Sequence, residues 1–508
     1  MHQFYSTPTH SPALLTALFR FAVTWLRDDR CSFVIEDAWN ENVTSSEFIK
    51  FYKKQASTKD ALQKWNKEVF GNCQDKIMLY CKKLRQSKLN PPSENTGPME
   101  EALQSELSEW LLRSESLWCQ KSRELWVKLG DRNTKFFHLS TIIKRKQNNI
   151  DAIQDDNGTW LTDTNSIRSL FLDSYKNLFS QGDDSFPPHL EHLVFPCITE
   201  DDNTELSRIP TPEEIKSTLF SIHDLKAPGP DGYPVIFYKQ FWSTIGIDVI
   251  KAITSFFQFG SMPKEVNNSL IVFIPKVSNP STVNHFRPIS LCNVVYKIIS
   301  KLLVMKLRPH LDKIISLAQS AFIPNRWIAE NQVIVQEMLH NFKTSKTNPG
   351  LMVIKLDLQK AYDRVSWKFI KTVLLHLGFN ETFSSWIFSC ISSVSFEILV
   401  NGGKTKSFKP SRRLRQGDPL SSYLFILGQE ILSRLLDQEL RQKKICGIKT
   451  SQRGLTITQV MYANDIVLFS KATKRDATNI SQILDKYCLW SGQLVNRNKS
   501  SIFSSKHT

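Results

Sequence analysis

Residues 352–379 read MVIKLDLQKAYDRVSWKFIKTVLLHLGF, and they carry the most informative structural signal in the chain. The first five residues are mostly apolar and partly β-branched, which predicts a buried strand that ends before Asp357. A carboxylate at the end of a buried strand can hold a cation, although Asp357 taken alone also fits a helix cap. Apolar side chains then recur at four-residue steps and predict a helix that Gly378 stops; they are Val365, Phe369, Val373 and Leu377.

A second stretch, residues 457–471, reads ITQVMYANDIVLFSK. Two apolar runs flank Ala463, Asn464 and Asp465, which is the pattern of a tight β-hairpin with a polar tip. In isolation this is an ordinary Asn-Asp turn. An acidic hairpin beside a strand that ends in an acid is also how a site for two divalent ions can be assembled, because such ions need hard oxygen ligands.

A third stretch, residues 412–436, reads RRLRQGDPLSSYLFILGQEILSRLL and predicts a helix. Asp418 can cap this helix, and Pro419 suits its first position. The pair Gln416-Gly417 allows the backbone to approach a ligand closely. Taken alone, the pattern is also that of a plain loop leading into a helix. One helical face is apolar and consists of Leu424, Leu427, Ile431 and Leu435.

The composition describes a globular protein with an anionic partner. Of the 508 residues, 41% are hydrophobic and 22% charged, which excludes a largely disordered chain. The formal net charge of +16 indicates nucleic acid first and a membrane surface second. The nine cysteines form no C-x-x-C pair, which argues against a disulfide framework or a zinc knuckle and indicates reduced thiols in an intracellular protein. No apolar run is long enough for a membrane span.

The N-terminal region is predicted to be mainly helical and basic. Residues 88–98, KLNPPSENTGP, interrupt a helical pattern, which predicts a helical hairpin or a coiled-coil arm. Residues 121–150 contain eight basic and two acidic residues, with Trp126, Phe136 and Phe137 among them. Such a segment can bind phosphates and stack on bases, or it can be a solvated helix face with its aromatics in a core. The candidate nucleic-acid-binding residues are Lys121, Arg123, Lys128, Arg132, Lys135, Lys144, Arg145 and Lys146.

Seven ordered segments resemble the conserved motifs of the reverse transcriptases of non-LTR (LINE-type) retrotransposons, most of all those of plants. KLDLQKAYDRVSW (355–367) resembles motif A, LRQGDPLSSYLF (414–425) motif B and MYANDIVLF (461–469) motif C. Each motif is weak by itself, but seven in order are specific. Residues 121–138 resemble the segment that leads into this domain in plant elements, and residues 18–41 the tail of their endonuclease. The other four matching segments are 226–242, 270–291, 320–326 and 492–504, the last resembling motif D.

The resemblance implies an α+β fold, namely the fingers and palm of a right-hand polymerase, preceded by a mainly helical basic N-terminal region. It implies an RNA-directed DNA polymerase that uses two Mg²⁺ ions, with Mn²⁺ as a possible substitute. The partners would be an RNA template, a DNA primer and dNTP, without a membrane, and the compartment would be the nucleus. The expected divisions are an endonuclease-tail remnant (1–42), a helical basic linker (43–150), a connecting segment (151–209) and fingers and palm with an incomplete thumb (210–508).

The resemblance also assigns roles to individual residues. Asp357 and the carbonyl group of Leu358 would bind metal, Tyr362 would disfavour a 2′-hydroxyl, and Lys499 would protonate pyrophosphate. Tyr362 could instead simply pack under the motif A helix, and the basic residues could be solvated surface charges. The remaining nucleotide contacts would be Lys276 and Arg287 at the triphosphate, with Gln416 and Gly417 lining the nucleotide pocket.

The sequence departs from this family at motif C. The family has aromatic-Ala-Asp-Asp, whereas this chain has Asn464 in place of the first, metal-binding Asp. Because Asn offers one neutral oxygen instead of a carboxylate, we expect polymerisation to be slowed about 100-fold or more. Asp465 could partly substitute if the turn shifted by one residue. Ser422 replaces the usual Pro of motif B, which is a lesser change.

Two other functions remain open from the sequence. Asn464 and the missing thumb fit a truncated, catalytically inactive relic that still binds nucleic acid. An organellar intron maturase shares the palm but is disfavoured, because residues 226–242 and 121–138 resemble plant retroelements. The sequence indicates no oligomeric state.

Overall fold

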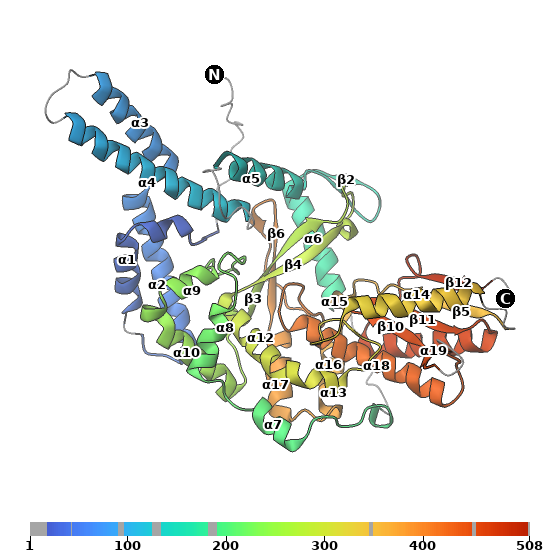
Figure 1. The fold of residues 1–508 in the computed structure, drawn as a ribbon. Coiled ribbons are helices and arrows are strands. Elements are labelled where there is room, and N and C mark those ends of the chain that lie inside the picture. The colour runs from blue at the N-terminus through green and yellow to red at the C-terminus, as the bar shows by residue number, and fades with distance from the viewer. Residues whose placement is uncertain are drawn as a thin grey trace.

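The structure is a computed structural model, and it describes residues 18–41, 43–89, 96–123, 134–180, 190–344, 349–449 and 454–505. Two four-stranded sheets lie among helices, and two long helices project from one end (Figure 1). These are α3 (Cys73–Leu89) and α4 (Thr96–Ser122), which pack side by side as the predicted helical hairpin. The fold therefore mixes helices with sheets, as an α+β protein does.

The sheet nearer the C-terminus is antiparallel throughout, in the order β10-β11-β5-β12. The predicted strand before Asp357 is confirmed as β5. Because Leu356 pairs with Ile466, the end of β5 lies beside the tip of the β10–β11 hairpin. The strands are β5 (Leu351–Leu356), β10 (Gln459–Tyr462), β11 (Asp465–Lys471) and β12 (Ser501–Ser504).

Successive side chains of a strand point to opposite faces of a sheet. In this sheet the side chains on both faces are buried in apolar clusters. Met352 and Ile354 belong to the main core, which is shared with three helices. Leu351 and Val353 form a second cluster with Met338 of α14 (Ile328–Thr344). The three helices over the first face are α16 (Trp367–His376), α18 (Ser421–Arg441) and α19 (Lys474–Ser491).

The other large sheet has the order β4-β3-β6-β7 and combines parallel with antiparallel pairing. Ile274 pairs with Arg287, so the loop between β3 and β4 places Lys276 and Arg287 at the same end of the sheet. The ring of Phe171, on α6 (Thr164–Ser180), packs 4.4 Å from the ring of Phe273. The strands are β3 (Asn268–Pro275), β4 (Phe286–Cys292), β6 (Ser395–Val400) and β7 (Gly403–Lys404).

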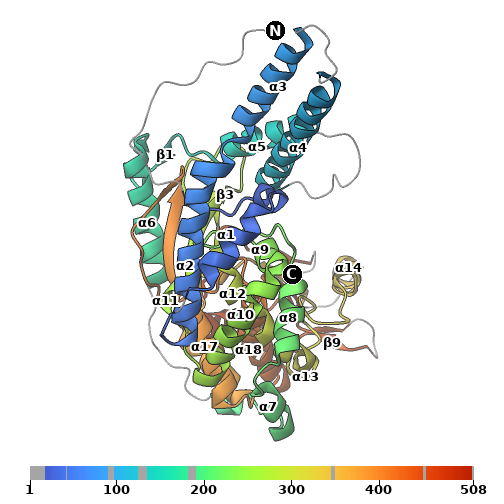
Figure 2. The same cartoon turned by 90° about the vertical axis from the view of Figure 1, so that its left-hand side faces the viewer.

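The N-terminal helices α1 and α2 pack against α10, as Figures 1 and 2 both show. Trp39 at the end of α1 donates a hydrogen bond to Asp248 at 2.8 Å, and Gln55 donates to the hydroxyl of Tyr238 at 2.6 Å. The buried core is continuous from Phe21 to Trp490. The four-part division of the chain stays a prediction. The helices in contact are α1 (Arg30–Trp39), α2 (Glu47–Trp65) and α10 (Trp242–Phe259).

The remaining elements connect these layers. The longer helices are α5 (Thr134–Asn148), α7 (Glu200–Leu206), α8 (Pro212–Phe220), α9 (Val235–Gln240), α12 (Val294–Leu307) and α17 (Glu381–Ser392). The short helices are η1 (Val23–Arg27), η2 (Asn66–Phe70), η3 (Leu190–His192), η4 (Val283–His285), η5 (Arg308–His310), α11 (Lys264–Asn267), α13 (Leu311–Ile314) and α15 (Ala361–Arg364). Two small hairpins pair β1 (Ile153–Gln154) with β2 (Trp160–Leu161) and β8 (Ile448–Lys449) with β9 (Thr456–Ile457).

The single helix expected after Asp357 is wrong in one respect, because it is broken at Val365 and Ser366. The chain forms α15 first and starts again as α16. Ser366 caps the second helix by accepting a hydrogen bond from the Phe369 N–H at 3.4 Å, and its own N–H donates to the Ser491 carbonyl at 2.9 Å. A tertiary contact thus interrupts a locally continuous helical pattern. Gly378 does follow the helix, with φ of +96°.

Two expectations about the whole chain can be compared with the structure. All nine cysteines are free thiols, as their spacing predicted. Within the described residues, no helix is both long and apolar enough to cross a bilayer.

Candidate active site

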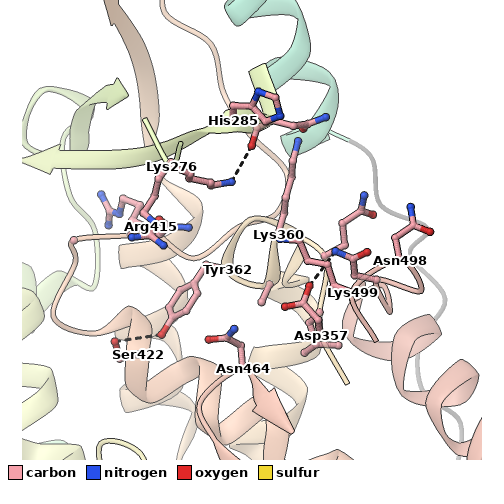
Figure 3. Close-up of a pocket in the computed structure, with 18 of the residues that line it drawn as sticks. Lys276, His285, Asp357, Lys360, Tyr362, Arg415, Ser422, Asn464, Asn498 and Lys499 are labelled. Atoms are coloured by element: carbon pink, nitrogen blue, oxygen red, sulfur yellow. Dashed lines mark hydrogen bonds between the residues drawn. The ribbon is translucent and has the colours of Figure 1, made fainter. Parts of the chain in front are cut away.

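A cavity of about 780 Å³ opens where the two large sheets meet (Figure 3). Its lining comes from the end of β5, the β10–β11 turn, the β3–β4 loop, the loop before α18 and the segment after α19. The cavity brings together side chains more than 200 residues apart in sequence, from Lys276 to Lys499. Nine of the residues proposed from the sequence line it, namely Lys276, Arg287, Asp357, Leu358, Tyr362, Gln416, Gly417, Asn464 and Lys499.

Asp357 follows β5 directly and projects into the cavity. Its N–H donates to Ser500 Oγ at 3.1 Å, and its Oδ2 accepts from Asn496 Nδ2 at 2.9 Å. The interpretation of Asp357 as a helix cap is wrong. The next helix, α15, begins after Lys360, which has φ of +50° and whose side chain makes no capping hydrogen bond. The carboxylate is therefore free of helix capping and faces the site.

The hairpin tip consists of Ala463 and Asn464, since Tyr462 pairs with Asp465 across the turn. Ala463 adopts a left-handed conformation, with φ of +52°, and its N–H donates to Gln319 Oε1 at 3.0 Å. This register places Asn464 in the cavity lining, beside Asp357. Asp465 is exposed and does not line the cavity, so its carboxylate reaches the site only if the register slips.

Tyr362 forms one wall of the cavity. Its hydroxyl donates to Ser422 Oγ at 3.4 Å, and its ring stacks on Phe425 with centroids 4.7 Å apart. Burial raises the pKa of the Tyr362 hydroxyl, so the group stays neutral at ordinary pH. Ser422, which stands in place of the expected Pro, thus supplies a polar partner that a Pro side chain lacks.

Basic side chains dominate the opposite wall. Lys276 Nζ donates to the Asn284 carbonyl at 3.0 Å, and its pKa is lowered by burial and by repulsion from Lys499 and Arg287. Lys360, which the sequence reasoning missed, also lines the cavity, and burial lowers its pKa. Its position three residues after Asp357 was the available signal. Several cations gathered in a concave site favour a polyanionic ligand.

The loop that carries Gln416 and Gly417 is held rigidly. Gly417 has φ of +106°, and an added Cβ would lie 2.9 Å from the Ser290 carbonyl oxygen. The Ser290 N–H donates to the Gln416 carbonyl at 2.8 Å. The predicted helix cap at Asp418 is wrong, because α18 starts only at Ser421.

Asp418 instead belongs to a buried polar network beneath this loop. It accepts from the Tyr296 hydroxyl at 2.7 Å and lies 3.4 Å from Arg415 Nε. Arg415 also donates to Asn267 Oδ1 at 2.7 Å.

The predicted apolar face of α18 is confirmed, because all four of its leucine and isoleucine side chains are buried.

Residues 274–508 match the family model described as reverse transcriptase (RNA-dependent DNA polymerase). This part of the chain is a reverse transcriptase domain. The resemblance to the reverse transcriptases of non-LTR retrotransposons is confirmed, and so is the fold class, an α+β polymerase fold. Motifs A to D, which lie between residues 355 and 504, all fall within the matched range.

Two relatives of this chain are proteins of transposable elements. A 149 kDa protein of the transposon TX1 from Xenopus laevis is 28% identical over 373 residues, covering 73% of this chain and 28% of that protein. The polyprotein of the element R2DM from Drosophila melanogaster is 27% identical over 262 residues, covering 51% of this chain and 23% of that protein. The chain thus spans about a quarter of the length of these two relatives.

Two further similarities concern smaller parts of the chain. An uncharacterised mitochondrial protein of Arabidopsis thaliana is 43% identical over 67 residues, covering 13% of this chain and 55% of that protein. Among solved structures, telomerase from Candida albicans aligns with 54% of this chain and 48% of its own, at 14% identity. The TM-score of this alignment is 0.35.

Reverse transcriptases generally use divalent metal ions. Asp357, the Leu358 carbonyl group and Asn464 offer one carboxylate and two neutral oxygens at the cavity, which suits a hard divalent cation. No group of three His, Cys, Asp or Glu side chains that could hold a metal ion occurs in the described ranges. The donor set therefore contains one carboxylate, which is that of Asp357.

The basic segment 121–150 is placed only in part. Lys128 and Arg132 lie outside the described residues, as does the side chain of Lys135. Phe137 is buried, with 4% of its surface exposed, which favours the interpretation of this aromatic as part of a core. Arg145 and Lys146 are exposed near the end of α5, and Lys144 Nζ donates to the Ser122 carbonyl at 3.0 Å.

A second cavity, of about 360 Å³, adjoins this segment. Lys121 and Arg123 line it together with Arg20 and Lys226, which the sequence reasoning did not single out. The lining contains no acidic side chain among the described residues. Burial and the nearby charge of Arg20 lower the pKa of Arg123. The lowered pKa reflects in part the crowding of cations at this cavity.

Proposed function

We propose that this domain carries out RNA-directed DNA synthesis and that Asn464 slows its nucleotidyl transfer. The observation that carries the proposal is the division of charge in the large cavity. Asp357 and Asn464 lie together at the end of the sheet. Four cations line the same cavity, namely Lys276, Arg287, Lys360 and Lys499.

In the proposed reaction, the primer 3′-oxygen attacks the α-phosphorus of a dNTP, and pyrophosphate leaves. Lys276 and Arg287 would bind the triphosphate and offset its charge. Lys499 would donate its proton to the leaving oxygen, and Tyr362 would pack under the sugar. Gln416 and Gly417 would let the backbone approach the nucleotide closely.

The proposal includes Mg²⁺ as the divalent cation, with Mn²⁺ able to replace it. A bound cation would neutralise phosphate charge and lower the pKa of the attacking hydroxyl. Asp357, Leu358 and Asn464 would hold it. Because Asn464 contributes no charge, we propose that the second ion expected for the family binds weakly. Asp465 remains a proposed substitute that requires a slipped turn.

The proposed partners are an RNA template and a DNA primer, and the proposed compartment is the nucleus, where a chromosomal primer would be found. The net charge of +16 supports a nucleic-acid partner. A plant source is consistent with the motifs and stays part of the proposal.

Primer extension on poly(rA) with an oligo(dT) primer tests this function. The chain, Asn464→Asp and Asn464→Asp/Asp357→Ala would be compared in Mg²⁺ and in Mn²⁺. We expect Asn464→Asp to extend the primer about 100-fold faster than the unaltered chain, and the double variant to be inactive. Equal rates for the unaltered chain and Asn464→Asp would show that Asn464 does not limit the reaction.

The second cavity favours an alternative function, namely nucleic-acid binding without catalysis. Its four basic side chains lie apart from Asn464 and do not depend on it. Filter binding of the same primer–template would be compared for the chain, Arg123→Gln and Lys121→Gln. We expect each substitution to weaken binding. We also expect it to reduce the slope of the logarithm of the binding constant against the logarithm of the salt concentration by about one. Unchanged binding in both variants would exclude this cavity as a phosphate site.

A further inference from the structure

The segment between α19 and β12 wraps around the catalytic candidate Asp357. Leu358 and Val495 form an isolated antiparallel bridge, and the Gln359 N–H donates to the Leu494 carbonyl at 2.8 Å. The chain on the C-terminal side of Asp357 therefore runs alongside this segment. The segment also carries Lys499, so it contributes to two sides of the cavity.

Asn496 makes the closest contacts within this arrangement. Its N–H donates to the Asp357 carbonyl at 2.8 Å, and its side-chain Nδ2 donates to Asp357 Oδ2 at 2.9 Å. Ser500 Oγ completes the ring, because it accepts from the Asp357 N–H at 3.1 Å and donates to the Asn496 carbonyl at 2.8 Å. The N–H, the carbonyl and the carboxylate of Asp357 are thus all bonded to one turn.

We propose that Asn496 is a positioning residue that orients the Asp357 carboxylate for cation binding. The inference rests on the proposed function. The terminal torsion of an Asp side chain is broad, so packing alone selects its orientation poorly. A hydrogen bond to Oδ2 fixes that torsion and leaves Oδ1 available to a cation. The side chain at position 496 must donate a hydrogen bond to hold the Asp357 carboxylate in this way. The amide of Asn496 can donate, whereas the carboxylate of an Asp at this position could not.

The same turn links Asp357 to the proposed proton donor. The Lys499 N–H donates to the Asn496 carbonyl at 3.1 Å, so the backbone of Lys499 is one hydrogen bond away from the residue that holds Asp357. Asn496 therefore sets the spacing between the carboxylate and Lys499. The position matters more in this chain than in one with an Asp at position 464, because Asp357 supplies the only carboxylate of the fitted donor set.

Mn²⁺ binding, followed by electron paramagnetic resonance, is the first test. Asn464→Asp would be compared with Asn464→Asp/Asn496→Ala and Asn464→Asp/Asn496→Leu, the last keeping the side-chain volume. We expect both double variants to bind Mn²⁺ about 10- to 100-fold more weakly, in line with the effect of removing a partner of a metal ligand. Leu494→Ala in the same background is the control, since Leu494 is exposed and contributes only its backbone.

A crystal structure of Asn496→Leu, without metal, is the second test and does not depend on activity. We expect the Asp357 carboxylate to turn away from its present orientation or to occupy two orientations. An unchanged orientation, or unchanged Mn²⁺ binding in both double variants, overturns the proposal. If Asn464→Asp fails to extend a primer, the proposed function fails, while the carboxylate orientation still decides the role of Asn496.

Discussion

The hydroxyl of Tyr362 lies 3.4 Å from Oγ of Ser422, which places a side chain of the motif A segment against the helix of motif B. The Tyr362 ring is fixed from the same helix, because it stacks on Phe425 with an interplanar angle of 12°. The ring consequently has one defined position at the edge of the large cavity. A rigid ring at this edge can exclude a substituent of the incoming sugar by steric contact.

The first prediction concerns sugar discrimination. In the Asn464→Asp background, Tyr362→Ala should raise the use of ribonucleotides relative to deoxynucleotides by about tenfold or more, because the excluding ring is gone. Tyr362→Phe keeps the ring and should leave the ratio nearly unchanged. The measurement is the ratio of kcat/KM for dTTP and UTP. Equal ratios for Tyr362→Ala and the parent would show that the ring does not select the sugar.

The second prediction concerns the pH dependence of triphosphate binding. The pKa of Lys276 is lowered by burial and by the charges of Lys499 and Arg287. Lys276 therefore loses its charge at a lower pH than an ordinary lysine, and dNTP affinity should fall as the pH rises towards that pKa. Lys499→Met removes one repelling charge, so the fall should move to higher pH.

Fluorescence titration of dTTP between about pH 7 and pH 10 measures this shift. Lys471→Met is the matched control, because Lys471 is exposed at the far end of β11. If the affinity for dTTP falls at the same pH in the unaltered chain and in Lys499→Met, then Lys276 and Lys499 are not coupled.

The third prediction concerns Asp231, in the loop before α9. Burial raises the pKa of its carboxyl to about 6, although the carboxylate accepts a hydrogen bond from the Tyr233 N–H at 3.1 Å. Between about pH 4 and pH 6 the folded state therefore binds more protons than the unfolded chain, so stability decreases as the pH rises through this window. Asp231→Asn should stabilise the protein at pH 7 by about 1 to 3 kcal/mol.

Thermal unfolding at pH 7 and at pH 4 tests this sign. The stabilisation by Asp231→Asn should be absent at pH 4, where the carboxyl is protonated in the folded state. Asp37→Asn, at an exposed position of α1, should change the stability by less than about 0.5 kcal/mol at either pH. Destabilisation by Asp231→Asn at pH 7 would mean that the charged form is favoured by its surroundings.

The fourth prediction concerns the buried network under Gln416. The guanidinium of Arg415 lies 3.8 Å from the centre of the Tyr296 ring and 3.4 Å from Asp418. Arg415→Met leaves the buried Asp418 without its cation and should cost about 3 to 5 kcal/mol of stability. The double variant Arg415→Met/Asp418→Asn should cost less than the two single changes together. Additive costs, measured by denaturant unfolding, would show that the two side chains act independently.

Local sequence patterns predicted elements well where the signal lies within the element itself. The strand before Asp357 and the hairpin around Asn464 follow from apolar runs and turn residues, and both occur as expected. The patterns failed where a distant partner intervenes. The backbone contact of Ser366 with Ser491 breaks a continuous helical repeat. The Asp418 carboxylate accepts a hydrogen bond from the distant Tyr296 hydroxyl, and α18 begins only at Ser421.

The sequence by itself determined the family, the order of the motifs and the two departures from it, Asn464 and Ser422, because these depend on residue identity. Tertiary structure decided which of those residues share a cavity. The pairing of β5 with β11 brings Asn464 beside Asp357, and the register of the turn leaves Asp465 outside the lining. Asn496 joins the site only through folding, because hydrogen bonds between distant segments carry no signature in local sequence.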